Sequence, residues 1–293
     1  MMSHIHHSAS ESFWVSTALI FAAFLYLSSW LGVRHQDQGS VEGWRAGSFL
    51  LGLLSIWIAT ASSLAALDHE MLTAHMVQHL LLMTLAPPLI LFGLPRKAQG
   101  HGMTQPFVPA VGSVMRSAPM QQFARVITQP ALCWLAAAGT LVVWHIPSVF
   151  MLAMRSQVWH GVEQASFLAT GLLFWWPVIR PLPNNGKWPE SSILLYLFFA
   201  TLPCDILSGF LVFCDRAIYP VFLSSPRSFG LSALEDQQCA GALMWTCVTV
   251  VYVIAGAVVA ARLLSSRWLQ DEAVLDSQSL AMPSSSVQSM ELF

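Results

Sequence analysis

Long apolar segments constrain this chain more than any other feature of its sequence. A helix needs about 20 mostly apolar residues to cross the hydrocarbon core of a bilayer. Of the 293 residues, 55% are hydrophobic and only 10% are charged, whereas a soluble domain carries about 25% charged residues. The sequence therefore predicts an all-α integral membrane protein, a bundle of seven transmembrane helices. The expected spans are residues 13–33, 44–67, 74–94, 130–150, 158–179, 192–213 and 239–264.

The remaining segments are polar. Residues 1–12 are expected to form a polar N-terminal arm, residues 13–264 the transmembrane domain, and the Ser-containing residues 265–293 a disordered tail. Pro87-Pro88 should kink the third span or end its regular helix early. Within the long loop that follows this span, residues 115–127 are expected to form a short interfacial helix.

The Lys and Arg residues predict the orientation. Ten of the 13 lie in the tail or in the loops after the first, third and fifth expected spans, and only Arg155, Arg216 and Arg227 lie on the other side. Cytoplasmic loops of membrane proteins carry an excess of Lys and Arg. We therefore expect the N-terminus outside, the C-terminus in the cytoplasm, and a multi-pass protein in contact with membrane lipid.

Charge and cysteine content exclude some classes of protein. The net charge is −2, so no basic field favours a nucleic-acid partner. The five cysteines form no CxxC pair, so no disulfide framework is inferred.

Histidines at one depth of the bundle form the candidate site. His75 and His79 lie four residues apart, which places both imidazoles on one helix face. In the predicted orientation, His145 near the end of the fourth span and His160 at the start of the fifth reach the same layer. Met244 lies about two turns into the seventh. Imidazole and thioether ligands suit copper, and thioether favours Cu(I), so these five residues are predicted metal ligands. The alternative is that each histidine only forms a hydrogen bond between packed helices.

Other polar residues near this layer are expected to assist. Asp236 and Gln237, at the start of the seventh span, and His69 and Glu70, before the third, are predicted to orient the ligands or to help release the metal. Asp205 lies near the middle of the sixth span and has no assigned role. It either forms a hydrogen bond with backbone freed near Pro203 or belongs to an ion path.

Several motifs in order resemble one known family. They are His75-Met76-Val77-Gln78-His79 with Pro87-Pro88, Trp144-His145-Ile146-Pro147, His160 with Phe174-Trp175-Trp176-Pro177, and Glu235-Asp236-Gln237-Gln238-Cys239-Ala240-Gly241 with Met244-Trp245. Together they resemble the polytopic CtaG family of assembly factors for caa-type cytochrome c oxidases, over residues 45–265. The loop 96–129 and the tail match no pattern of the family.

The resemblance implies a non-enzymatic, multi-pass chaperone of the respiratory chain in the bacterial inner (plasma) membrane. It would take part in building the copper centres of the oxidase catalytic subunit, its expected partner together with other oxidase assembly proteins. Two alternatives stay open, an accessory structural subunit of an oxidase and a b-type haem protein with axial histidines. The sequence also leaves open whether the protein forms a homodimer.

Overall fold

The computed structural model describes residues 2–36, 43–94, 118–180, 191–224 and 228–281, and every regular element in these ranges is a helix. The predicted all-α class is confirmed. In chain order the elements are α1 (Met2–Gln36), α2 (Gly43–Ala61), α3 (Leu64–Leu67), α4 (Leu72–His79), the π-helix η1 (Leu80–Leu85), α5 (Ala86–Gly93), α7 (Ala118–Ile127), α8 (Pro130–His145), α9 (Pro147–Arg155), α10 (Gln157–Ile179), α11 (Ser192–Phe213), the 3-10 helices η2 (Pro220–Leu223) and η3 (Ser228–Gly230), and α12 (Ala233–Ala281).

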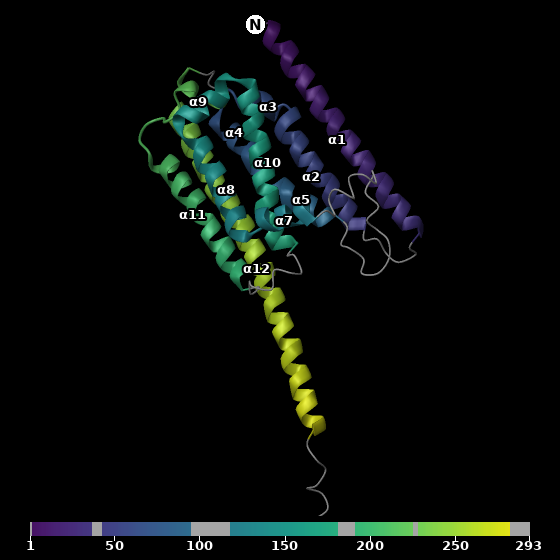
Figure 1. Cartoon of the computed structure of the whole chain (residues 1–293). Coiled ribbons are helices and arrows are strands. Elements are labelled where there is room, and N and C mark those ends of the chain that lie inside the picture. The colour runs from purple at the N-terminus through teal and green to yellow at the C-terminus, as the bar shows by residue number, and fades with distance from the viewer. Residues whose placement is uncertain (1, 37–42, 95–117, 181–190, 225–227, 282–293) are drawn as a thin grey trace, which may run out of the picture.

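The long helices lie side by side in a bundle (Figure 1). α12 packs along α11, α2 along α5, and α10 along α8. α1 lies at the edge against α2, and α12 extends beyond the bundle at the end opposite to α3 and α9. The segment from α4 to α5 is the most enclosed candidate span, with 56% of its apolar window buried against at most 22% in the others. The histidines of α4 therefore lie in the centre of the bundle.

The apolar helices identify a membrane protein, but the predicted number of spans is not confirmed. Within the described residues, five helices are long and apolar enough to cross a membrane, and a sixth crossing results if α8 and α9 form one bent span. α10 has 23 residues, but its first turns carry Gln157, His160, Glu163 and Gln164, which lower its apolarity. The predicted orientation is not confirmed either.

The prolines of the third span do not end it. The irregularity comes before them, where η1 replaces the α-helix directly after His79, and Pro87-Pro88 occupy the first positions of α5. Proline fits there because the first N–H groups of a helix need no intrahelical acceptor. The indole Nε1 of Trp175 donates to the carbonyl of Met83 at 3.2 Å. In an α-helix this carbonyl would accept from the N–H of residue 87, which proline lacks.

The expected fourth span is bent rather than straight. α8 ends at His145, and α9 leaves it at an angle of 77°. Ile146 is extended and Pro147 begins α9, because the residue before a proline disfavours the α-helical conformation. His145 is thereby the last residue of α8, inside the bundle.

Two expectations about polar segments meet the described residues only in part. The short helix predicted over residues 115–127 is present as α7 from residue 118 onward, and its interfacial position stays a prediction. α12 continues to Ala281, so residues 265–281 are helical where a disordered tail was expected. Residues 95–117 of the loop and 282–293 of the tail lie outside the described residues.

Candidate metal centre

The buried face of α4 carries the two histidines of the central motif. His75 and His79 are 0% and 5% exposed, and their ring centroids lie 4.3 Å apart. The spacing of four residues produces this contact, since residues i and i+4 are neighbours on a helix. Phe150 and Phe167 pack against the two rings and complete an apolar wall around them.

Glu163 of α10 faces both imidazoles. Its side chain is fully buried, and its Oε1 lies 3.4 Å from Nε2 of His75 and 3.4 Å from Nε2 of His79. Neither carboxylate oxygen and no nitrogen of the two rings has a hydrogen-bond partner within the described part of the chain. A buried carboxylate without such compensation is strongly unfavourable. The three side chains therefore converge on a position that calls for a cation.

The spacing of these atoms fits a metal better than a hydrogen bond. Hydrogen bonds between nitrogen and oxygen span about 2.7–3.2 Å. In a tetrahedral site with metal–ligand bonds of about 2.0–2.2 Å, neighbouring ligand atoms lie roughly 3.4 Å apart. The distances from Glu163 to His75 and to His79 match that edge length. Potential ligand atoms that all lie within 4.8 Å of one another are those of His75, Glu163 and His160, so this trio, rather than the one with His79, has the spacing of ligands of a first-row transition metal.

A second group lies on the connector between α3 and α4. Asp68 is completely buried; its Oδ2 is 3.2 Å from Nε2 of His160, and its Oδ1 is 3.7 Å from Nε2 of His69. Potential ligand atoms of Asp68, His69 and His160 all lie within 4.8 Å of one another. Those of His75, His160 and Glu163 do so as well, so His160 belongs to both groups.

His145 approaches a thioether instead of a carboxylate. Its Nδ1 lies 2.7 Å from the carbonyl of Leu141, and its Nε2 lies 3.3 Å from Sδ of Met76. Because the carbonyl only accepts, Nδ1 carries the proton in the neutral ring, and Nε2 turns its lone pair toward sulfur. Imidazole and thioether thus present two adjacent soft donors, beside His79, whose ring centroid is 5.9 Å from that of His145.

A side chain that lies outside the expected spans binds the backbone of His145. The hydroxyl of Tyr219, which follows α11, donates to the His145 carbonyl at 3.0 Å. Burial and the nearby charge of Glu163 raise the pKa of this hydroxyl above its usual range. The phenol therefore stays a donor at physiological pH.

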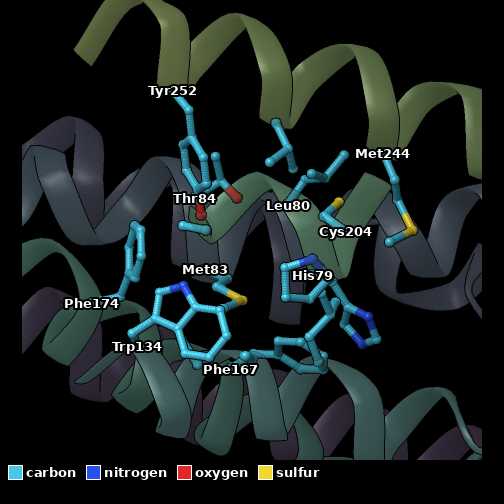
Figure 2. A pocket seen from close by; sticks show the side chains of 16 residues that line it. His79, Leu80, Met83, Thr84, Trp134, Phe167, Phe174, Cys204, Met244 and Tyr252 are labelled. Atoms are coloured by element: carbon cyan, nitrogen blue, oxygen red, sulfur yellow. The ribbon is translucent and has the colours of Figure 1, made fainter. Parts of the chain in front are cut away.

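Met244 reaches the same cavity as His79. The two residues line an internal cavity of about 50 Å³, together with Met83 and Cys204. Figure 2 shows the three sulfur-bearing side chains around this space. Soft donors are thus grouped on the side of His79 remote from the Asp68 connector.

Asp236 and Gln237 lie near the site, but their side chains bind backbone. The carboxylate of Asp236 accepts the N–H groups of Leu72 and Thr73 at 2.6 and 3.1 Å. The Gln237 side chain accepts from the N–H of Ile218 at 2.7 Å and donates to the carbonyls of Leu211 and Arg216. These contacts join α12 to the start of α4 and to the segment after α11, so both residues position the elements that carry the ligands.

The other predicted residues lie apart from the histidines. Glu70 is on the connector, half-buried. Asp205 is half-buried in α11, and its Oδ1 has no hydrogen-bond partner among the described residues. It belongs to neither group of potential metal ligands.

Sequence reasoning missed Glu163, and it placed Asp68 near the histidines without giving it a role. Glu163 is the single acidic residue of α10 and lies three residues after His160, so both face one side of the helix. An ionisable residue in a membrane-embedded segment is a candidate functional residue. This rule, applied to Asp205, also identifies Glu163; Asp68 has no comparable signal, because it lies in a connector.

Comparison with known proteins adds the family. Residues 24–266 match the family described as cytochrome c oxidase caa3 assembly factor (Caa3_CtaG). The chain is also similar to an uncharacterized protein of Mycobacterium leprae, 21% identical over 239 residues that cover 78% of this chain and 35% of the relative. A second uncharacterized protein, from Mycobacterium bovis, is 22% identical over 239 residues, covering 79% and 36%. The chain thus spans about a third of the length of these relatives. No solved structure matches it.

Proposed function

Because the chain belongs to the family of cytochrome c oxidase caa3 assembly factors, we propose that it binds copper inside the membrane and helps to insert it into the nascent catalytic subunit of an oxidase. The observation that carries the proposal is the convergence of His75, His79 and Glu163. Their atoms are buried and lack hydrogen-bond partners among the described residues, Glu163 lies 3.4 Å from each imidazole, and potential ligand atoms of His75, Glu163 and the neighbouring His160 all lie within 4.8 Å of one another.

The donor types support copper. Imidazole suits copper, zinc and iron, whereas thioether sulfur favours Cu(I). Met76 and Met244 lie next to the two inner histidines, His145 and His79 respectively. Imidazole and carboxylate ligands with thioether sulfur nearby favour copper over zinc, because zinc does not need thioether ligands.

The protein residues hold and release the ion rather than perform catalysis. His75 and His79 donate Nε2, Glu163 supplies the negative charge that offsets the charge of the ion, and the surrounding apolar side chains exclude water. The carboxylate is the weakest of these ligands for Cu(I), because a hard oxygen donor matches a soft cation poorly. A transient site benefits from one such ligand, since release then begins with a weak bond.

A Cu(I) titration of the detergent-purified protein tests the proposal. We compare wild type with His75→Ala/His79→Ala, using a chromophoric Cu(I) chelator as competitor, and use His101→Ala as a matched loss of one histidine outside the described residues. The wild type and His101→Ala should retain copper in competition, and the double variant should lose the tight site. An unchanged stoichiometry in the double variant would refute the assignment.

The haem alternative is weaker on steric grounds. Cofactor sites occupy about 300–1,000 Å³, whereas the pocket beside His79 holds about 50 Å³, and the larger pocket of about 1210 Å³ that His145 lines contains no second histidine as the other axial ligand. A visible spectrum of the same preparation separates the two functions, because a haem protein shows a Soret band and a copper chaperone does not. For the accessory-subunit alternative, we expect the protein to be absent from the mature oxidase rather than present at fixed stoichiometry.

A further inference from the structure

Asp68 is the buried charge that the inner site does not explain. Its side chain is 0% exposed, and neither oxygen has a hydrogen-bond partner within the described ranges. It lies in the connector before α4. A cation at that place would offset the buried carboxylate.

Two imidazoles face this carboxylate within 4 Å. Nε2 of His160 lies 3.2 Å from one oxygen and Nε2 of His69 lies 3.7 Å from the other. Two imidazoles and a carboxylate are a common ligand set for zinc and related divalent ions. The two distances bracket the roughly 3.4 Å edge of a tetrahedral site.

The exposed fraction of the side chain falls from His69 through His160 to His75, along a row of neighbouring imidazole rings. The side chain of His69 is 54% exposed, that of His160 12%, and that of His75 0%. Ring centroids are 5.3 Å apart between His69 and His160, 5.7 Å between His160 and His75, and 4.3 Å between His75 and His79. The row runs from the connector at the end of the bundle to the buried carboxylate of Glu163.

We propose that Asp68, His69 and His160 form a second, outer metal site, and that His160 is the ligand shared with the inner site. This rests on the proposed function for the role of the inner site only. An ion held by the outer group passes inward by ligand exchange. Its bonds to Asp68 and His69 break as bonds to His75 and Glu163 form, while His160 remains bound, so no electron is transferred and no free ion crosses the apolar wall.

The outer site has a different preference from the inner one. It offers one carboxylate and two imidazoles and no sulfur, which suits divalent first-row ions. Zn²⁺ is therefore the probe of choice, because it binds such sets and undergoes no redox change. Its use also keeps the test independent of the identity of the physiological metal.

The experiment measures Zn²⁺ stoichiometry and release in detergent-purified protein. All variants carry His4→Ala, His6→Ala and His7→Ala, so that the histidines near the N-terminus add no ions. Asp68→Asn and His69→Ala test the outer site, and His75→Ala/His79→Ala tests the inner one. Asp215→Asn is the matched control, since it makes the same change on a carboxylate that is 91% exposed. Release is followed by stopped-flow mixing with a chromophoric chelator.

One imidazole nitrogen binds a single ion at a time, so we expect two ions per chain in the parent and in Asp215→Asn, with His79 completing the inner site while His160 binds the outer ion. Each outer variant should retain one ion, and that ion should exchange with the chelator at least tenfold more slowly than in the parent, because its exit step is lost. The inner double variant should retain one fast-exchanging ion. His160→Ala should weaken both sites.

Three results overturn the inference. One ion in the parent, lost in the inner variant and unaffected by Asp68→Asn and His69→Ala, removes the outer site but leaves the proposed function standing. One ion that only the outer variants lose removes the inner site instead. In the third result, Asp68→Asn loses both ions while His69→Ala keeps two ions and an unchanged release rate. Asp68 then has a purely structural role.

Discussion

Replacing Asp236 with alanine should destabilise the bundle, because this carboxylate caps α4 from a different helix. α4 begins at Leu72, and the first N–H groups of a helix have no intrahelical acceptor. Asp236 accepts from Leu72 at 2.6 Å and from Thr73 at 3.1 Å, across 164 and 163 residues of sequence. The side chain is 5% exposed, so water cannot replace it without rearrangement.

The size of the effect follows from these two bonds. A hydrogen bond to a charged group contributes about 1.5–3 kcal/mol, so the loss of both should cost about 3 kcal/mol or more. For a protein of this size, 1 kcal/mol shifts the unfolding midpoint by about 2–4 °C. Asp236→Ala should therefore lower the midpoint by about 6–12 °C. Asp236→Asn, which keeps one acceptor oxygen, should show roughly half of that shift.

Heat denaturation in detergent, followed by circular dichroism at 222 nm, measures this shift. Asp215→Ala is the control, because it removes a carboxylate that is 91% exposed and should move the midpoint by less than about 2 °C. A midpoint for Asp236→Ala within 2 °C of wild type would refute the capping role. In that case the interpretation of Asp236 as a release group would regain weight.

Three further outcomes are expected. Gly171→Ala should lower the unfolding midpoint by an amount equivalent to about 1–3 kcal/mol, because a Cβ there would lie 2.8 Å from the carbonyl oxygen of Met83. Gly161→Ala on the same helix is the control and should be near neutral, because its Cβ meets nothing within 4 Å. Equal midpoints for the two variants would contradict the close packing of α10 against η1. Glu163→Gln should weaken Cu(I) binding in chelator competition at least tenfold while the protein remains folded, because the negative ligand is lost and the shape is kept; unchanged affinity would exclude Glu163 as a ligand. Since the pKa of Tyr219 is raised in the folded protein, the contribution of its hydroxyl to stability is complete below about pH 10 and is lost as the pH rises further. The unfolding midpoints of Tyr219→Phe and wild type should therefore differ more at pH 8 than at pH 11. An equal difference at both pH values would contradict the shifted pKa.

Much of the fold was predictable because membrane segments are determined by local composition. Each expected span coincides with helix in the structure, since a chain in lipid must satisfy its backbone hydrogen bonds within the segment. The sequence also indicated part of the histidine cluster, whereas metal binding by that cluster stays a prediction. His75 and His79 share a face by helix periodicity alone, and the family could be recognised from motifs whose order is visible in the chain.

Tertiary packing decided the partners of those histidines. Which oxygen faces Nε2 of His75 depends on how α10 is rotated against α4, and Gly171 sets that approach through contacts with Met83 and Pro87. Nothing in the sequence distance between residues 75 and 163 specifies it. The bend at Ile146, similarly, decides that His145 ends beside Met76, inside the bundle.

The sequence by itself thus determined the class of protein, the positions of the helices, and one histidine face at their centre, because hydrophobic length and helical periodicity are local properties. The tertiary structure alone decided that Glu163 and Asp68 complete the cluster and that Asp236 and Gln237 brace it. The physical reason is that a buried charge is stabilised by whichever group lies within about 4 Å in space, and that neighbour is chosen by helix packing and not by the order of residues along the chain.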